Sequence, residues 1–562
     1  MVTILIRCVA LTALACSFAA GAPAREPVMA AKAAAASAPD RAGEALGALI
    51  YLKGMLSSDK PVEGARQNGI GVSGADAACV NCHLRSGLGS KEGSFPIPPV
   101  TGEYLFHDLA HGGNDPLLPY VESMRGNRTP YTSATLARAI REGVDSDGRH
   151  LSYLMPRYAL SDGDMAALTA YLNRLTVVRS PGVTPSTLNF ATIFTPDADP
   201  AKRAGALEVL QRYVLETNSF PIGPQPRMWT SNKTAQAKSM YMAHLRWQLH
   251  VWQLTGPAAT WRAQLEKHLH DEPVFAVLSG VGGSNWAPVH EFCEQDAVPC
   301  LFPNVEVPIV DDNGFYSLYF SKGVLLEAEL IANRLAADEK SRGLVVDQIY
   351  RRGDSGEAAA QALTSELKTH GITVRDHALP SEAAGSGLGT ALRAAQKAQV
   401  LVLWLRAKDI AALGPPPAGA PVYLSGLMSG LEDAPLPGGW RDRALVALPL
   451  DTPDRRGVRL DYPLGWFKFR HIPVVAKQVQ IDTYLACSVV SQVLRELSDS
   501  YVRTYFVEQL QGMLEHRLVT GYYPHLSMSY HERFASRGGY IARFTPAGKG
   551  TRLVADSDWT VP

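Results

Sequence analysis

The feature that most constrains this chain is the run at residues 79–83, which is Cys-Val-Asn-Cys-His. Two thiols separated by two residues and followed at once by an imidazole form the attachment motif of a c-type haem. Thiols at this spacing can form thioether bonds to the two haem vinyl groups, and His83 then lies under the iron. The sequence therefore predicts a fold built around one flat, apolar cofactor that is anchored by Cys79 and Cys82.

Two other chemistries use paired cysteines at this spacing. A thioredoxin-like site would use Cys79 and Cys82 as a redox-active dithiol. A structural zinc site would need two further Cys or His ligands at matching spacing, and none follows closely in the sequence. The sequence favours haem and leaves these two chemistries as alternatives.

A haem that only passes electrons needs a second strong axial ligand, and Met155 is the candidate. A thioether ligand raises the reduction potential, and Pro156 would stiffen the loop that presents it. A helix is predicted directly downstream at 162–175, with Ser161 as its N-cap. Three further histidines are predicted to have surface or loop roles: His107, His111 and His150.

The N-terminus has the pattern of a targeting segment. Arg7 supplies a positive charge, residues 8–20 form an apolar run too short to span a bilayer comfortably, and small residues at 20–22 offer a cleavage site. We therefore expect a signal peptide at 1–22, a flexible leader at 23–39, no transmembrane segment in the mature chain and a periplasmic location, where c-type haem is attached. Lipoprotein anchoring at Cys16 ranks lower, because the residues before it match that pattern imperfectly.

The overall composition excludes some partners and indicates several domains. Lys and Arg together number 54, and Asp and Glu together also number 54, so net charge gives no support for nucleic acid or a membrane surface as a partner. A length of 562 residues implies more than one domain. Cys293 and Cys300 lie seven residues apart, which in an oxidising compartment predicts a local disulfide.

Strands and helices alternate after a linker predicted at 179–187. Strands are predicted at 188–195, 274–278, 298–302, 343–350, 371–378, 399–405 and 421–425, and helices at 199–216, 286–296 and 323–337. This order predicts parallel sheets wrapped by helices. Residues 188–562 exceed what one core holds, so two α/β lobes are expected.

Residues 40–178 resemble a class I cytochrome c domain. The resemblance rests on the run at 79–83, on Met155-Pro156 and on the helix predicted after it. It implies an all-α fold in which a helix at 41–55 crosses the helix at 162–175. It also implies one covalent haem c with His83 and Met155 as axial ligands, and a carbonyl of the proline-rich loop at 97–99 that accepts the other N–H of His83.

Residues 188–562 resemble the branched-chain amino-acid-binding group of type I periplasmic binding proteins. The resemblance rests on 274–284, where a strand leads into Ser-Gly-Val-Gly-Gly-Ser, and on 298–303, 316–320 and 533–541. It implies that a ligand carboxylate is gripped between two lobes by Ser284 and Asn285, with Ser425 at a strand end facing the same cleft. The chain departs from the family at 195–199, where Thr-Pro-Asp-Ala-Asp replaces a Gly/Ser-rich turn.

These observations predict a periplasmic c-type cytochrome that transfers single electrons and is not an enzyme. Its redox partner would be a dehydrogenase, a respiratory carrier or both, and the fused module would bind a small ligand or dock that partner. One alternative is a solute-binding receptor or sensor, with an amino-acid-like ligand and an accessory haem. Another is a haem peroxidase, which is disfavoured if Met155 fills the sixth position of the iron.

Overall fold

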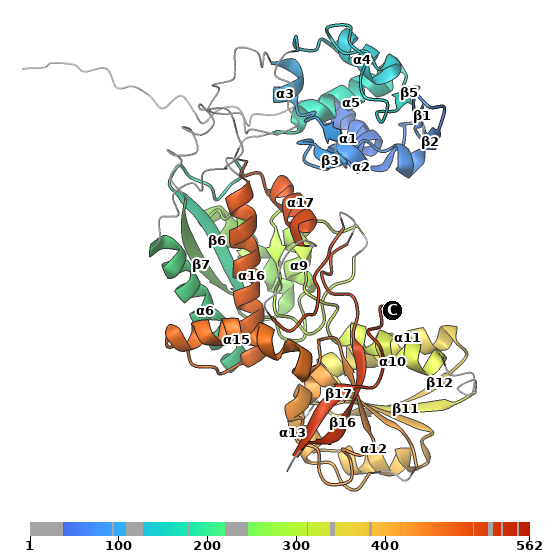
Figure 1. The fold of residues 1–562 in the computed structure, drawn as a ribbon, viewed down its shortest axis with the longest axis vertical. Coiled ribbons are helices and arrows are strands. Elements are labelled where there is room, and N and C mark those ends of the chain that lie inside the picture. Colours follow the sequence, from blue (N-terminus) through green and yellow to red (C-terminus); the bar gives the residue numbers. More distant parts are fainter. Residues whose placement is uncertain are drawn as a thin grey trace, which may run out of the picture.

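The computed structural model describes residues 38–562 apart from twelve internal gaps: 93–94, 108–127, 177–178, 220–244, 312, 338–342, 382–384, 417–418, 498–499, 515–520, 530–531 and 548–549. The predicted signal peptide, the leader up to residue 37, Cys16 and His111 lie outside the described residues. The described chain forms an N-terminal domain followed by two α/β lobes, which we call lobe 1 and lobe 2 (Figure 1).

The N-terminal domain is mainly helical. Its helices are α1 (Ala38–Lys53), α2 (Val80–His83), α3 (Gly102–Phe106), α4 (Ser133–Glu142) and α5 (Asp162–Arg174). Five short strands join them: β1 (Glu63–Ala65), β2 (Gly71–Ser73), β3 (Ser90–Glu92), β4 (Phe95–Ile97) and β5 (Arg157–Tyr158). The predicted helices at 41–55 and 162–175 are confirmed, whereas the expectation of a domain without strands is wrong for these short pairs.

The helices α1 and α5 cross at close range, as expected. Gly47 makes this possible, because a Cβ placed there would meet the Ala167 carbonyl and would lie 2.7 Å from Tyr171 Cβ. One turn further along α1, the rings of Tyr51 and Tyr171 pack with their centroids 5.2 Å apart. The predicted cap of α5 is also present, since the Asp164 N–H donates to Ser161 Oγ at 3.1 Å.

Lobe 1 is built on a five-stranded parallel sheet. Its order is β10 (Ser317–Leu318), β9 (Cys300–Leu301), β8 (Ala276–Leu278), β6 (Thr187–Phe194) and β7 (Arg246–Gln253). The helices described in this lobe are α6 (Pro200–Ser219), α8 (Trp261–Asp271), α9 (Ala287–Gln295), α15 (Pro453–Phe469), α16 (Lys477–Glu496) and α17 (Arg503–Leu514). In Figure 1, α16 stands beside this sheet and α15 runs along the base of the lobe.

Lobe 2 contains a seven-stranded sheet. Its order is β12 (Thr373–Leu379), β11 (Val345–Arg351), β13 (Val400–Trp404), β14 (Val422–Ser425), β15 (Ala444–Leu448), β16 (Tyr540–Ala547) and β17 (Gly550–Ala555). The first five strands are parallel to one another, while β16 pairs antiparallel with β15 and with β17. Its helices are α10 (Val324–Ala336), α11 (Ser355–Thr369), α12 (Leu388–Ala394), α13 (Ala407–Ala411) and α14 (Gly426–Ser429).

The chain passes between the lobes three times. It leaves lobe 1 between β10 and α10, returns between β15 and α15, and leaves again between α17 and β16. Each lobe is therefore completed by a segment distant in sequence. The prediction of two α/β lobes is confirmed. The strands of both sheets are parallel as predicted, except that β16 pairs antiparallel with β15 and with β17.

The N-terminal domain also contacts lobe 1 directly. The Ser86 N–H donates to the Glu508 carboxylate of α17 at 2.9 Å, and the Arg85 guanidinium lies 4.6 Å from the centre of the Phe315 ring. Ser86 and Glu508 are both buried. The loop that follows the Cys-x-x-Cys-His run is thus packed against lobe 1, in addition to the chain connection at 179–186.

Candidate functional site

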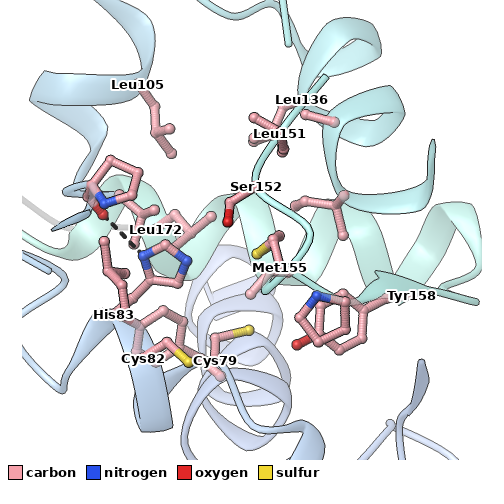
Figure 2. Close-up of a pocket in the computed structure, with 18 of the residues that line it drawn as sticks. Cys79, Cys82, His83, Leu105, Leu136, Leu151, Ser152, Met155, Tyr158 and Leu172 are labelled. Carbon is pink, nitrogen blue, oxygen red and sulfur yellow. Dashed lines mark hydrogen bonds between the residues drawn. The ribbon is translucent and has the colours of Figure 1, made fainter. Parts of the chain in front are cut away.

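The run at 79–83 folds as a single helical turn at one wall of a cavity. Cys79 is the N-cap residue of α2, and His83 is its last residue. Residues three apart in a helical turn lie on the same face. Figure 2 accordingly shows the sulfur atoms of Cys79 and Cys82 close together, beside the imidazole of His83. All three side chains line the same cavity.

The imidazole of His83 is fixed by a backbone carbonyl. Its Nδ1 lies 2.9 Å from the Pro98 oxygen (Figure 2). A carbonyl oxygen only accepts, so Nδ1 carries the proton and Nε2 keeps its lone pair. Burial lowers the pKa of His83, while the Pro98 hydrogen bond opposes this in part. The ring is therefore neutral at pH 7, which is the form that binds a metal ion. The predicted contact with the loop at 97–99 is confirmed.

Met155 lies across the cavity from His83 (Figure 2). Its loop is held by its own backbone, since the Met155 N–H donates to the Ser152 carbonyl at 3.1 Å. The Arg157 guanidinium donates to the Met155 carbonyl. The thioether predicted as the second ligand is thus in the same cavity as the imidazole and the two thiols.

The remaining wall of the cavity is largely apolar. The space measures about 1660 Å³, part of it open to solvent. Aliphatic side chains from several helices and loops line it: Ile50, Leu105, Leu136, Leu151, Leu168 and Leu172. An apolar slot with thiols on one wall and two opposed metal-ligating groups fits a haem attached through its vinyl groups. The donor set and the lining therefore both suit this cofactor.

The two alternatives for the cysteine pair find less support. Burial raises the pKa of Cys79 to about 12, whereas a redox-active dithiol needs a cysteine with a lowered pKa. Within the part of the chain that the structure describes, no three His, Cys, Asp or Glu side chains gather as metal ligands. The zinc alternative therefore lacks its remaining ligands there. His107 and His150 are exposed, in line with surface roles.

The predicted ligand grip of lobe 1 is engaged by the chain itself. The Ser284 N–H and Oγ both donate to Asp197 Oδ2, at 2.9 and 3.1 Å. The Gly283 N–H donates to Thr195 Oγ1 at 2.9 Å, and that hydroxyl donates to Asp197 Oδ1 at 2.6 Å. The departure noted at 195–199 thus brings a carboxylate to the donors expected to hold a ligand. Asn285 lies just before α9, where its side-chain oxygen accepts from the Ala287 N–H at 3.0 Å.

Ser425 does not face a cleft, which corrects the sequence prediction. Its side chain is fully buried in lobe 2, where its hydroxyl donates to the Glu327 carboxylate and accepts from the Met428 N–H at 3.1 Å. Burial raises the pKa of Glu327 to about 8, against the opposing effect of the Ser425 hydrogen bond. The strand end was predicted correctly, but the side chain points into the core.

Cys293 and Cys300 are both buried and are free thiols in the structure. The two side chains are close enough to hydrogen bond, and this contact together with burial raises the pKa of Cys293. The predicted partners are therefore neighbours, and the disulfide between them stays a prediction.

Sequence analysis missed a network of charges between the lobes. Glu306 accepts from Lys202 of lobe 1 at 2.7 Å and from two nitrogens of Arg406 of lobe 2 at 2.8 and 2.6 Å. Ser355 of α11 donates to the same carboxylate at 2.7 Å. Despite burial, these cations hold the pKa of Glu306 well below its usual range. No sequence signal marks the network, because its members are about 50 to 200 residues apart.

Comparison with known proteins finds solved structures that align with about two thirds of this chain. A fatty acid ABC transporter substrate-binding protein from Thermomonospora curvata aligns with 14% identity and a TM-score of 0.46, covering 68% of this chain and 95% of that one. A branched-chain amino acid ABC transporter structure from Thermus thermophilus with bound valine aligns with 11% identity and a TM-score of 0.46. The alignment covers 67% of this chain and 97% of that one.

A third structure is the solute-binding protein of an ABC transporter from Rhodopseudomonas palustris BisB5, in complex with 3,4-dihydroxybenzoic acid. It aligns with 10% identity and a TM-score of 0.46, covering 67% of this chain and 97% of that one. No protein-family model and no curated protein matches the chain. Among the residues described, no helix has the length and apolar character needed to cross a membrane.

Proposed function

We propose that this chain is an exported c-type cytochrome fused to a two-lobed α/β module, and that it transfers single electrons through one covalently attached haem. The observation that supports this most is the convergence of Cys79, Cys82, His83 and Met155 on one largely apolar cavity. These residues come from two parts of the chain more than 70 residues apart, and their convergence on one cavity supports the proposal.

The residues divide the work among them. Cys79 and Cys82 would each add a thiol across one haem vinyl group, so that the cofactor cannot dissociate. His83 would donate its Nε2 lone pair to the iron, and Pro98 keeps the ring in the required tautomer. Met155 would close the sixth position. When bound, haem supplies a one-electron ferric–ferrous couple.

An absorption spectrum of the purified protein tests this assignment. We expect a low-spin spectrum in both oxidation states, because His83 and Met155 both bind the iron. Met155→Leu should shift the oxidised protein towards high spin and lower its reduction potential. Met428→Leu, a matched change at a buried methionine of lobe 2, should leave both unchanged. An unchanged Met155→Leu spectrum would contradict the ligand assignment.

The same measurement separates electron transfer from peroxidase activity. A peroxidase needs an open coordination position for its substrate, so its spectrum is high-spin as purified.

In our proposal the partners are redox proteins, namely a dehydrogenase, a respiratory carrier or both, in the periplasm. The rings of Phe95 and Tyr153 contact one another at the surface, 5.7 Å apart, and Phe95 also lines the cavity. We expect such a partner to approach there.

A second candidate function is a solute-binding receptor or sensor with an accessory haem. It is favoured by the presence of two α/β lobes, between which the chain passes three times. A thermal-shift screen with amino acids, short acids and alcohols tests it, because a ligand at 100 times its dissociation constant adds about 2.7 kcal/mol of stability. Since Asp197 already holds the Ser284 donors, we expect simple carboxylates to give no shift, which would favour a docking role.

A further inference from the structure

The outer face of α15 carries an exposed apolar stripe. Val458, Tyr462 and Phe469 are 83%, 65% and 72% exposed, and their spacing of four and seven residues places them on one side of the helix. Leu460 and Phe467 occupy the opposite side and are buried against the rest of the lobe. Single exposed apolar residues are ordinary on protein surfaces, whereas a contiguous stripe indicates an interaction surface.

The stripe also contains a gap. Gly465 lies on the same side of α15, between Tyr462 and Phe469, and a Cβ added there would meet nothing within 4 Å. A large side chain from a partner helix can therefore approach the backbone at this position. Helices pack by inserting a side chain of one helix into a space between side chains of the other, and this gap beside an aromatic ring provides such a space.

The order of these residues makes the stripe complementary to itself. Two copies of α15 can be placed antiparallel, with a two-fold axis between positions 463 and 464. Tyr462 of each copy then lies opposite Gly465 of the other, and Val458 lies opposite Phe469. Every contact occurs twice, as an isologous interface requires. A large side chain meets a gap, or an aliphatic side chain meets an aromatic ring, in every pair.

The charges flanking the stripe agree with the same register. Asp461 and Lys468 are exposed on one flank of the stripe. The two-fold axis brings Asp461 of each copy within one helical turn of Lys468 of the other, on the same side of the helix pair. Opposite charges across an interface fix register and favour the correct partner.

We propose that the partner of this face is a second copy of the chain, so that the protein forms a two-fold symmetric dimer through antiparallel pairing of α15. Figure 1 shows α15 at the margin of lobe 1, away from the N-terminal domain. The haem cavities would therefore stay accessible in the dimer. This proposal does not depend on the haem assignment.

Sedimentation velocity of the full mature protein over a wide range of concentrations tests the proposal. We expect a monomer–dimer equilibrium, and Tyr462→Arg should raise its dissociation constant at least tenfold. Val561→Arg, at an exposed valine near the C-terminus, is the matched control and should have no effect. A wild-type protein that is monomeric throughout, or a dimer that survives Tyr462→Arg, overturns the proposal.

A charge exchange tests the register. Lys468→Asp should weaken the dimer, because it places two carboxylates close to each other across the interface. The double variant Asp461→Lys/Lys468→Asp should restore the dimer, since it exchanges both charges. Unchanged circular dichroism and melting temperature of the variants will show that folding is intact. A double variant that is as weak as Lys468→Asp alone overturns the proposed register.

Discussion

The crossing of α1 and α5 offers a sharp test of how the N-terminal domain holds its cavity. A methyl group at position 47 would lie 2.7 Å from Tyr171 Cβ and would also meet the Ala167 carbonyl. Ordinary carbon contacts begin near 3.5 Å, so the two helices must separate by about 1 Å. Overpacking of this kind costs about 1–3 kcal/mol.

Gly47→Ala also has a favourable component, because alanine is preferred to glycine in a helix by about 0.5–1 kcal/mol. Gly43→Ala isolates that component. Gly43 lies one turn earlier in α1, and a Cβ there would meet nothing within 4 Å. We therefore expect Gly43→Ala to raise the free energy of unfolding of this domain slightly. Gly47→Ala should lower it, with a difference of about 1–3 kcal/mol between the two variants, because the helix-propensity gain is common to both.

Urea unfolding followed by haem absorbance and by circular dichroism measures this difference. Haem absorbance reports on the N-terminal domain, since α1 and α5 both contribute side chains to the cavity. A Gly47→Ala variant as stable as Gly43→Ala would refute the reasoning, because the two helices would then have room for the methyl group.

Two further predictions concern contacts between the parts of the chain. Burial raises the pKa of Glu508 to about 7, so the folded protein binds a proton that the unfolded chain has released, and stability should fall by about 3 kcal/mol as pH rises from 4.5 to 7. Glu508→Gln should remove this part of the pH dependence, which melting temperatures measured between about pH 4.5 and 7 will show. The prediction is contradicted if the melting temperatures of the wild type and the variant change with pH to the same extent. Arg406→Gln should lower the free energy of unfolding by about 1–2 kcal/mol in urea, allowing for its partial exposure, because Glu306 loses a cross-lobe partner. Arg393→Gln is the control, and an equal effect of the two changes would contradict a role for the network.

The sequence predicted best those features that depend on neighbours in the chain. The run at 79–83 specifies its own helical turn, and Ser161 caps a helix whose residues follow it directly. The buried strands β8, β9, β11, β13 and β14 are short, largely apolar runs and were expected near their observed positions. Met155 was also found, because a methionine before a proline and a helix is unusual beside this motif.

Features that depend on distant parts of the chain were not predicted. β16 pairs antiparallel with β15 although almost 100 residues separate them, and no local pattern encodes that direction. Ser284 was expected to hold a ligand, but a carboxylate 87 residues away reaches its donors. The contact between Ser86 and Glu508 spans 422 residues. In each case tertiary packing decides the outcome, and the residues involved carry no sequence motif.

Covalent attachment of haem at Cys79 and Cys82 is the central claim, and intact-mass spectrometry of the denatured protein tests it most directly. Denaturation releases any haem that is held only by ligation, while thioether bonds survive. We predict that the mature chain, purified from a host that attaches c-type haem, exceeds its amino-acid mass by that of one haem. The excess should be absent in Cys79→Ala/Cys82→Ala. A wild-type chain that shows only its amino-acid mass would contradict the claim.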